Sequence, residues 1–467
     1  MPDGHRRFGA RLLAGLFLLT VLMQYGLSCL DPAGVRALSG DEKRYIAVAR
    51  SWSAGEPVEL DPLWPPGYPV FLSSVFAAAG EAGALFWIMS LQAAAILAAG
   101  MALAGIARMA GASEGIAALA GAILVVDPQV ASFSRLFWPE AIHLALLLSA
   151  LGLVIALNAG RFDRPNAAQP SGFLRSRLPW IALGLLLGCA IATKSLLLPF
   201  IPLLLLILLA VDGRKLGVRE RLARATCLLL PLLAVLAPVS RFEHARSGSW
   251  SPGGSARFNL WVGLTDVSPR SLRDDRAFAE YLKYRDGGAT FAERQRAITL
   301  RLRELVAERG WPAILAGQFP RQYQRLFDRE SYFSAMLPPD GSRVVAGEGF
   351  AQAPPALARL LGGFETGLYA TVLFLAPLGL WRMLRTRRTG ARWIAGLLAG
   401  QLVLFYFLHV KSRYRLTLMP LLILGAVWTV AELCRGRDAG TPPPAGLEIG
   451  LSASFGALLL YLAFAPA

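Results

Sequence analysis

Charged residues are scarce in this sequence, and cysteine is scarcer still. Only 17% of the 467 residues are Asp, Glu, Lys or Arg, whereas 55% are hydrophobic. The four cysteines, Cys29, Cys189, Cys227 and Cys434, lie in or beside apolar runs and lack the spacing of metal ligands. Cysteines in such surroundings behave as small buried hydrophobic residues. The sequence therefore excludes a zinc or redox site built on cysteine.

The surplus of basic residues does not indicate a nucleic-acid partner. The formal net charge is +16, but most Lys and Arg residues stand in short loops beside apolar runs. In that position they set the orientation of a membrane protein. The chain also lacks a convincing internal repeat. We expect no nucleic acid among its partners.

Long apolar runs dominate the rest of the chain, and the mean hydropathy is +0.48. A helix rises 1.5 Å per residue, so about 20 apolar residues cross the ~30 Å of bilayer hydrocarbon. The first run is too long for the core of a signal peptide and is interpreted as an uncleaved helix. The pattern predicts an all-α polytopic membrane protein with about eleven crossings and one interfacial piece at 67–80. The crossings are 8–30, 83–107, 115–135, 138–158, 179–193, 195–211, 225–240, 360–381, 392–410, 413–433 and 446–466.

The distribution of basic residues predicts the orientation. With the N-terminus in the cytoplasm, the inner segments carry 20 Lys and Arg residues and the short outer segments carry nine, as the positive-inside rule requires. Three parts follow: a membrane module at 1–240 with a first outer loop at 31–82, an external subdomain at 241–355, and a C-terminal membrane module at 356–467. Within the external part we expect a charged helix at 291–309 and an amphipathic one at 311–333.

Lys194 interrupts an apolar stretch at 179–211 whose two flanks are both basic. Two cytoplasmic flanks need an even number of crossings, so the chain must turn back near Lys194. Each arm then has about 15 residues, roughly 22 Å of helix, which is short of a full span. The turn, and Lys194 with it, should therefore lie in a recess. A lysine there needs an anionic partner unless it extends to water.

The segment 39–80 begins with two adjacent carboxylates, Asp41 and Glu42. A short amphipathic run and the aromatic turn LWPPGYP follow. This segment is too polar to cross a bilayer and too aromatic for a plain linker, and we interpret it as an active-site shelf on one membrane face. Two simpler interpretations stay open: Asp41 caps a helix, and Glu42 is an acid favoured by the helix dipole.

Other polar groups fall on the same predicted face. Glu140 opens the fourth crossing with His143 one turn deeper, and Arg413 and Arg415 open the tenth. Acids and cations gathered at one membrane face suit an anionic, lipid-borne substrate. A lipid phosphate is an acceptable leaving group, so transfer of its sugar needs cations on the phosphate and one carboxylate base. Asp41 is the candidate base, and the candidate phosphate holders are Lys194, Arg413 and Arg415.

Structural alternatives apply to these residues as well. Arg413 and Arg415 could be interfacial anchors, and Glu140 with His143 could be a hydrogen-bonded packing pair. Tyr68 could belong to the aromatic belt, together with Trp64 and Trp138. Asp127, which precedes Pro128, is interpreted as a helix-end residue.

Four motifs carry a resemblance to a known superfamily. They are DEKRY from Asp41 with PPGYPVFLSSVFAAAG after it, WPEAIHLALLLSA around Glu140, LGLLLGCAIATKSLLLP around Lys194, and SRYRLTLMPLLILGA from Ser412. In this order the chain resembles the GT-C superfamily of polyprenyl-phosphate-sugar-dependent glycosyltransferases, specifically the bacterial protein O-mannosyltransferase and aminoarabinose transferase group. The likeness covers the first seven crossings and the tenth, whereas the external insertion and the last crossing match poorly.

This resemblance implies a function and a site. Asp41 would be the catalytic base, assisted by Glu42, in an inverting transfer at the outer face of a bacterial inner membrane. The donor would be a polyprenyl-phosphate-linked sugar that enters from the lipid, and a glycan, lipid or protein would be the acceptor. We place Tyr45, Tyr68, Glu140 and His143 in the pocket. Relatives differ in whether a divalent metal assists. The rival functions are a transporter or flippase of a lipid-linked glycan, and an assembly subunit without activity.

Overall fold

The chain is seen here as a computed structural model. The structure describes residues 2–30, 38, 40–58, 60–159, 173–202, 204–205, 217–265, 276–337, 354–386, 389–435 and 446–464. Every regular element in these ranges is helical, as the sequence predicts. The TPPP stretch near 441 lies outside the described residues.

Among the described residues, six helices are long and apolar enough to cross a membrane, which indicates an integral membrane protein. Four shorter apolar helices accompany them. These ten helices overlap ten of the crossings predicted from the sequence, and the number of crossings stays a prediction. The eleventh, 195–211, begins as a 3₁₀ helix, η1 (Ser195–Phe200), and its residues 203 and 206–211 lie outside the described part. The long helices are α1 (Pro2–Leu30), α3 (Gly67–Ala110), α6 (Glu140–Asn158), α9 (Val218–Ser247), α15 (Pro355–Arg385) and α16 (Thr389–Phe407); the shorter ones are α4 (Glu114–Val126), α7 (Phe173–Thr193), α17 (Met419–Arg435) and α18 (Gly446–Phe464).

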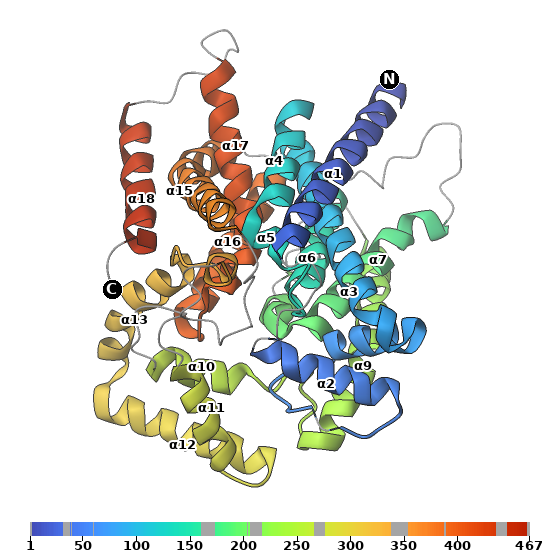
Figure 1. Cartoon of the computed structure of the whole chain (residues 1–467), viewed down its shortest axis with the longest axis vertical. Coiled ribbons are helices and arrows are strands. Elements are labelled where there is room, and N and C mark those ends of the chain that lie inside the picture. The colour runs from blue at the N-terminus through green and yellow to red at the C-terminus, as the bar shows by residue number, and fades with distance from the viewer. Residues whose placement is uncertain are drawn as a thin grey trace.

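The apolar helices form two neighbouring groups. Helices α1, α3, α4 and α6 lie on one side, and α15, α17 and α18 lie on the other (Figure 1). Glycines permit the closest approaches: a Cβ at Gly379 of α15 would overlap the carbonyl of Gly425 in α17, and one at Gly184 of α7 would overlap that of Leu228 in α9. Small residues let helix backbones touch in this way within a membrane.

Two interruptions predicted from the sequence are present. Gly80, at φ 68, breaks α3 into two helices, and the first of them covers the predicted interfacial piece at 67–80. Only glycine adopts such a φ without strain. Helix α7 ends at Thr193, and Lys194 follows in extended backbone before η1. Lys194 therefore lies at a break between two helices, as expected.

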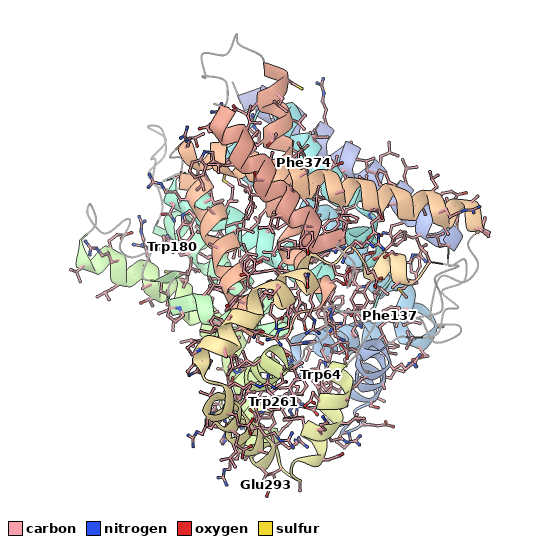
Figure 2. The ribbon with its side chains drawn as sticks, turned by 90° about the vertical axis from the view of Figure 1, so that its left-hand side faces the viewer. Trp64, Phe137, Trp180, Trp261, Glu293 and Phe374 are labelled. Atoms are coloured by element: carbon pink, nitrogen blue, oxygen red, sulfur yellow. The ribbon has the colours of Figure 1, made fainter. Side chains whose placement is uncertain are left out.

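Short helices gather at one end of the molecule, beside α2 (Asp41–Ser53) (Figure 1). Glu293, at the start of α12, marks the far tip of this end in Figure 2, where Trp64 and Trp261 lie deeper. A capping box of Thr290 and Glu293 fixes the start of α12, which has the predicted bounds. Helix α13 ends at Phe327, six residues before the predicted end. The short helices are α10 (Ala256–Thr265), α11 (Arg276–Asp286), α12 (Phe291–Arg309), α13 (Trp311–Phe327) and α14 (Tyr332–Ala335).

Candidate functional site

Asp41 is the first residue of α2 and its carboxylate is partly exposed. Gly40, at φ 50, is the N-cap residue, and no side chain caps this helix. The capping interpretation of Asp41 is therefore wrong. Asp41 instead accepts a hydrogen bond from Nη2 of Arg413 at 3.0 Å across 372 positions of sequence. The unpaired N–H groups at the start of α2 also favour a negative charge here.

Arg413 comes from η4 (Ser412–Thr417), a 3₁₀ helix between α16 and α17. Its guanidinium lies 4.8 Å from the ring centre of Trp138, 5.7 Å from that of Tyr414 and 5.8 Å from that of Tyr332. Burial opposes its charge, but Tyr332, Glu140 and Asp41 more than offset burial, so the pKa of Arg413 lies well above its usual value. We call Trp138, Tyr332 and Tyr414 the arginine cage. It holds a permanently charged group beside Asp41.

Glu140 and Lys194 extend the chain of charges. The Glu140 side chain is only 3% exposed, and its Oε1 lies 3.3 Å from Nζ of Lys194 and 3.7 Å from Nε of Arg413. Lys194 also lies 4.5 Å from the ring centre of Tyr414. The anionic partner expected for Lys194 is therefore present. Asp41, Arg413, Glu140 and Lys194 form one chain of alternating sign, which we call the charge chain.

Two tyrosines, Tyr45 of α2 and Tyr68 of α3, lie beside the charge chain. Tyr45 is buried and meets Tyr68 edge to face, with ring centres 5.2 Å apart. Burial, and then the charge of Asp41, raise the pKa of Tyr45 well above its usual value, so its hydroxyl stays neutral. The Tyr68 hydroxyl donates to Gln92 at 2.7 Å, and Gln92 donates to the carbonyls of Ser134 and Leu136. These bonds fix the turn that leads to Trp138.

Glu42 has a different position from its neighbour. Its side chain is fully buried, and Oε1 accepts the backbone N–H of Phe137 at 2.7 Å. Phe137 lies above Trp64 in the view of Figure 2. Glu42 thereby ties α2 to the turn that carries Trp138. The catalytic role of Glu42 stays a prediction.

Two other predicted residues, His143 and Arg415, have partners outside the charge chain. His143 is buried, and its Nδ1 lies 3.2 Å from the carbonyl oxygen of Ala190, so it packs α6 against α7. Arg415 is buried on the far side of η4, where it contacts Gln129 and Asp328. The structure thus brings Asp41, Arg413, Glu140 and Lys194 into one chain of contacts, whereas His143 bonds the backbone of α7 and Arg415 faces Gln129 and Asp328.

The donor set does not resemble a metal centre. Asp41 and Glu140 each face a cation, and no group of three or more His, Cys, Asp or Glu side chains converges within the described ranges. A divalent ion would have to displace Arg413 or Lys194 from these carboxylates. We therefore derive no step through a metal.

The arginine cage was missed by sequence reasoning. Trp138 was assigned to the aromatic belt, and Tyr332 lies in a part of the chain without a recognised motif. Tyr414 stands within the SRYR motif between the two arginines, so its position beside Arg413 was a usable signal. Tyr332 and Trp138 meet edge to face at 4.8 Å, a contact that only the fold reveals.

The charge chain lies where the apolar helices meet the short helices, in an all-helical membrane protein. No family model and no curated protein sequence matches the chain. Solved structures do. The chain is similar to the archaeal oligosaccharyltransferase AglB from Archaeoglobus fulgidus in complex with an inhibitory peptide and a dolichol-phosphate, with a TM-score of 0.54 and 14% identity over 98% of this chain and 55% of that one.

Two further structures of the Archaeoglobus fulgidus oligosaccharyltransferase agree. The apo form matches with a TM-score of 0.54 and 14% identity, covering 98% of this chain and 55% of that one. The form tethered to an acceptor peptide with the NVT sequon matches with a TM-score of 0.53 and 12% identity, covering 98% and 54%. The chain spans about half the length of these proteins. At such identity the likeness shows the fold alone, an all-helical membrane fold like that of this oligosaccharyltransferase; the narrower group suggested by the sequence motifs stays a prediction.

Proposed function

We propose that this protein is an inverting glycosyltransferase that moves a sugar from a polyprenyl-phosphate donor to an acceptor at the outer face of a bacterial inner membrane. One observation carries the proposal: a partly exposed carboxylate, Asp41, lies 3.0 Å from a caged arginine that is itself linked through Glu140 to Lys194. A base and two cations are the groups that this reaction needs. The fold likeness to a lipid-dependent oligosaccharyltransferase supports the same class.

In this proposal the donor phosphate lies against Arg413 and Lys194. An arginine fork can hold two phosphate oxygens at once, whereas a lysine acts as a point charge. A phosphate at this place competes with Asp41 for the guanidinium. The carboxylate oxygen that now accepts from Arg413 then becomes available to the acceptor hydroxyl, so donor binding prepares the base.

The transfer itself needs no group beyond these. Asp41 takes the proton of the acceptor hydroxyl as that oxygen forms a bond to the anomeric carbon. The bond from this carbon to the phosphate oxygen breaks on the opposite side, and its electron pair stays on the phosphate. Arg413 and Lys194 stabilise the charge that the leaving phosphate gains. Back-side attack inverts the anomeric configuration.

The external subdomain supplies the acceptor side in this proposal. Tyr281 of α11 donates to Asp61 at 3.0 Å and accepts from Arg44 at 3.4 Å, which docks α11 onto the first outer loop. Arg44 lies three residues after Asp41, on the same face of α2. The proposed division at 1–240, 241–355 and 356–467, with the N-terminus in the cytoplasm, places this junction on the outer side.

Donor cleavage tests the proposal. Purified protein in lipid vesicles would receive labelled undecaprenyl-phosphate sugars, one sugar at a time, with an extract of cell-envelope acceptors. We expect labelled sugar to leave one of these donors and free undecaprenyl phosphate to accumulate. Arg382→Lys serves as the control and should react normally. It changes the ion pairs of Arg382 with Glu432 and Glu448, near the C-terminal end of α15 and outside the charge chain. A donor that crosses the vesicle membrane uncleaved would support a flippase and contradict the proposal.

A further inference from the structure

Arg415 is among the most completely buried large side chains of the described chain, with 1% of its surface exposed. Its Nε and Nη2 donate to Oε1 of Gln129 at 2.9 and 2.7 Å, and Nη1 donates to the carbonyl of Asp328. Its guanidinium carbon lies 4.1 Å from the ring centre of Tyr369. All three nitrogens thus have acceptors within the protein. Because the side chain is also almost fully buried, its guanidinium is turned to these acceptors and away from any substrate phosphate.

The local backbone explains why Arg413 and Arg415 separate. Both belong to η4, and a 3₁₀ helix has three residues per turn. Residues two apart therefore lie on different faces. Arg413 points to the charge chain and Arg415 points into the protein. The interior side of η4 is thereby bound to α5 (Pro128–Ser132) through Gln129 and to α15 through Tyr369.

The helix α5, to which Arg415 is bound through Gln129, is itself fixed at its start by a helix cap. Asp127 ends α4 and caps α5 by accepting the N–H of Val130 at 3.1 Å. Arg415 therefore fixes η4 against an element that is itself fixed.

The contact with Asp328 extends the anchor to the arginine cage. Tyr332 follows Asp328 by four residues, at the start of α14, whose N-cap Ser331 accepts the N–H of Ser334 at 2.9 Å. The preceding carbonyl, of Phe327, accepts from the Tyr369 hydroxyl at 2.8 Å. The segment 327–335 is thereby held at its start by Arg415 and Tyr369. Tyr332 in this segment then contacts the ring of Trp138 and the guanidinium of Arg413.

We propose that Arg415 is a positioning residue for donor binding: it sets Arg413 through η4 and Tyr332 through Asp328, so that both sides of the arginine cage are held from one buried point. This inference rests on the proposed function for its effect on the donor. It replaces the prediction that Arg415 holds the phosphate itself.

Hydrogen exchange tests the anchoring without any substrate. Arg415→Lys keeps the charge but replaces the planar fork, which binds Gln129 and Asp328 from different nitrogens, by a single ammonium. We expect faster amide exchange in 328–336 and in 412–417 together, whereas the control Arg382→Lys leaves both unchanged. Gln129→Met removes the main acceptor of Arg415 and should loosen η4 in the same way. Unchanged exchange in both segments would overturn the anchoring role, whatever reaction the protein catalyses.

A double-mutant cycle tests the effect on the donor phosphate, with undecaprenyl phosphate as the probe. We expect Arg415→Lys to weaken binding about tenfold, a change of about 1.4 kcal/mol, when Arg413 is present. In an Arg413→Ala background the same change should have less than about a twofold effect, because Arg415 acts through Arg413. Equal losses in both backgrounds would show a direct phosphate contact and overturn the inference. A wild-type protein that fails to bind the probe would overturn the proposed function instead, and hydrogen exchange alone would then decide the anchoring.

Discussion

Glu140→Gln perturbs the centre of the charge chain with almost no change of shape. The Glu140 carboxylate, which is 3% exposed, faces Lys194 at 3.3 Å and Arg413 at 3.7 Å. Removal of one partner from a buried ion pair costs about 3–5 kcal/mol, because the other charge is left uncompensated. Here Lys194 is 19% exposed and Arg413 keeps Asp41. We therefore expect a loss of about 2–3 kcal/mol.

Thermal unfolding in detergent measures this loss. With a melting entropy of about 2.1 cal/mol/K per residue, 1 kcal/mol shifts the midpoint of a chain of this length by about 1 °C. The variant should therefore melt roughly 2–3 °C below the wild type. Because Lys194 loses its counter-ion and Arg413 keeps only Asp41, undecaprenyl phosphate should bind the variant more tightly than the wild type and raise its midpoint further.

A matched control separates the site from general stability. Glu432→Gln also removes a carboxylate that lies 3.3 Å from an arginine. This pair joins Glu432 of α17 to Arg382 near the C-terminal end of α15 and lies outside the charge chain. It should lower the midpoint without changing the response to undecaprenyl phosphate. A Glu140→Gln protein with an unchanged midpoint and unchanged lipid affinity would refute the reasoning on the charge chain.

Three further predictions concern single elements. Lys194→Met should weaken binding of undecaprenyl phosphate about tenfold, as expected for the loss of one charge-assisted contact; an unchanged Kd in a lipid-binding titration would contradict this. Burial raises the pKa of Tyr281 above 10.0, so its neutral hydroxyl adds stability below pH 10 that is lost as pH rises through the folded value. Unfolding midpoints measured across this range should decline less steeply in Tyr281→Phe than in the wild type, and parallel curves would count against the prediction. Gly379→Ala places a methyl group against the carbonyl of Gly425 and should destabilise the protein by about 1–3 kcal/mol; a normal melting temperature would show that α15 and α17 are not in contact.

Much of the fold could be predicted because membrane helices leave strong local signals. A long apolar run predicts its own helix, and Lys194 stands out as an interruption within such a run. The basic flanks around 179–211 were enough to place a break at Lys194. The length of α13 was overestimated because the pattern beyond Phe327 stays amphipathic, whereas the chain turns there at Asp328.

The site could be predicted only in part, because its contacts join distant segments. Asp41 and Arg413 were selected separately, as polar groups at one face, but their pairing across 372 positions depends on how α2 and η4 pack. The charge of Arg415 gave no information on which side of η4 it faces. Glu42 was grouped with Asp41 by adjacency, although successive helix residues point in different directions and Glu42 faces Phe137.

Asp41→Asn tests the central claim most directly, because it removes the base and keeps the shape of the side chain. The measurement is sugar transfer from the labelled polyprenyl-phosphate donor that the wild type cleaves, recorded together with the affinity for undecaprenyl phosphate. The account predicts a variant that binds the lipid phosphate at least as well as the wild type and transfers sugar about 10²–10⁴-fold more slowly, the contribution of a general base. Transfer at the wild-type rate would contradict the assignment of Asp41 as the base.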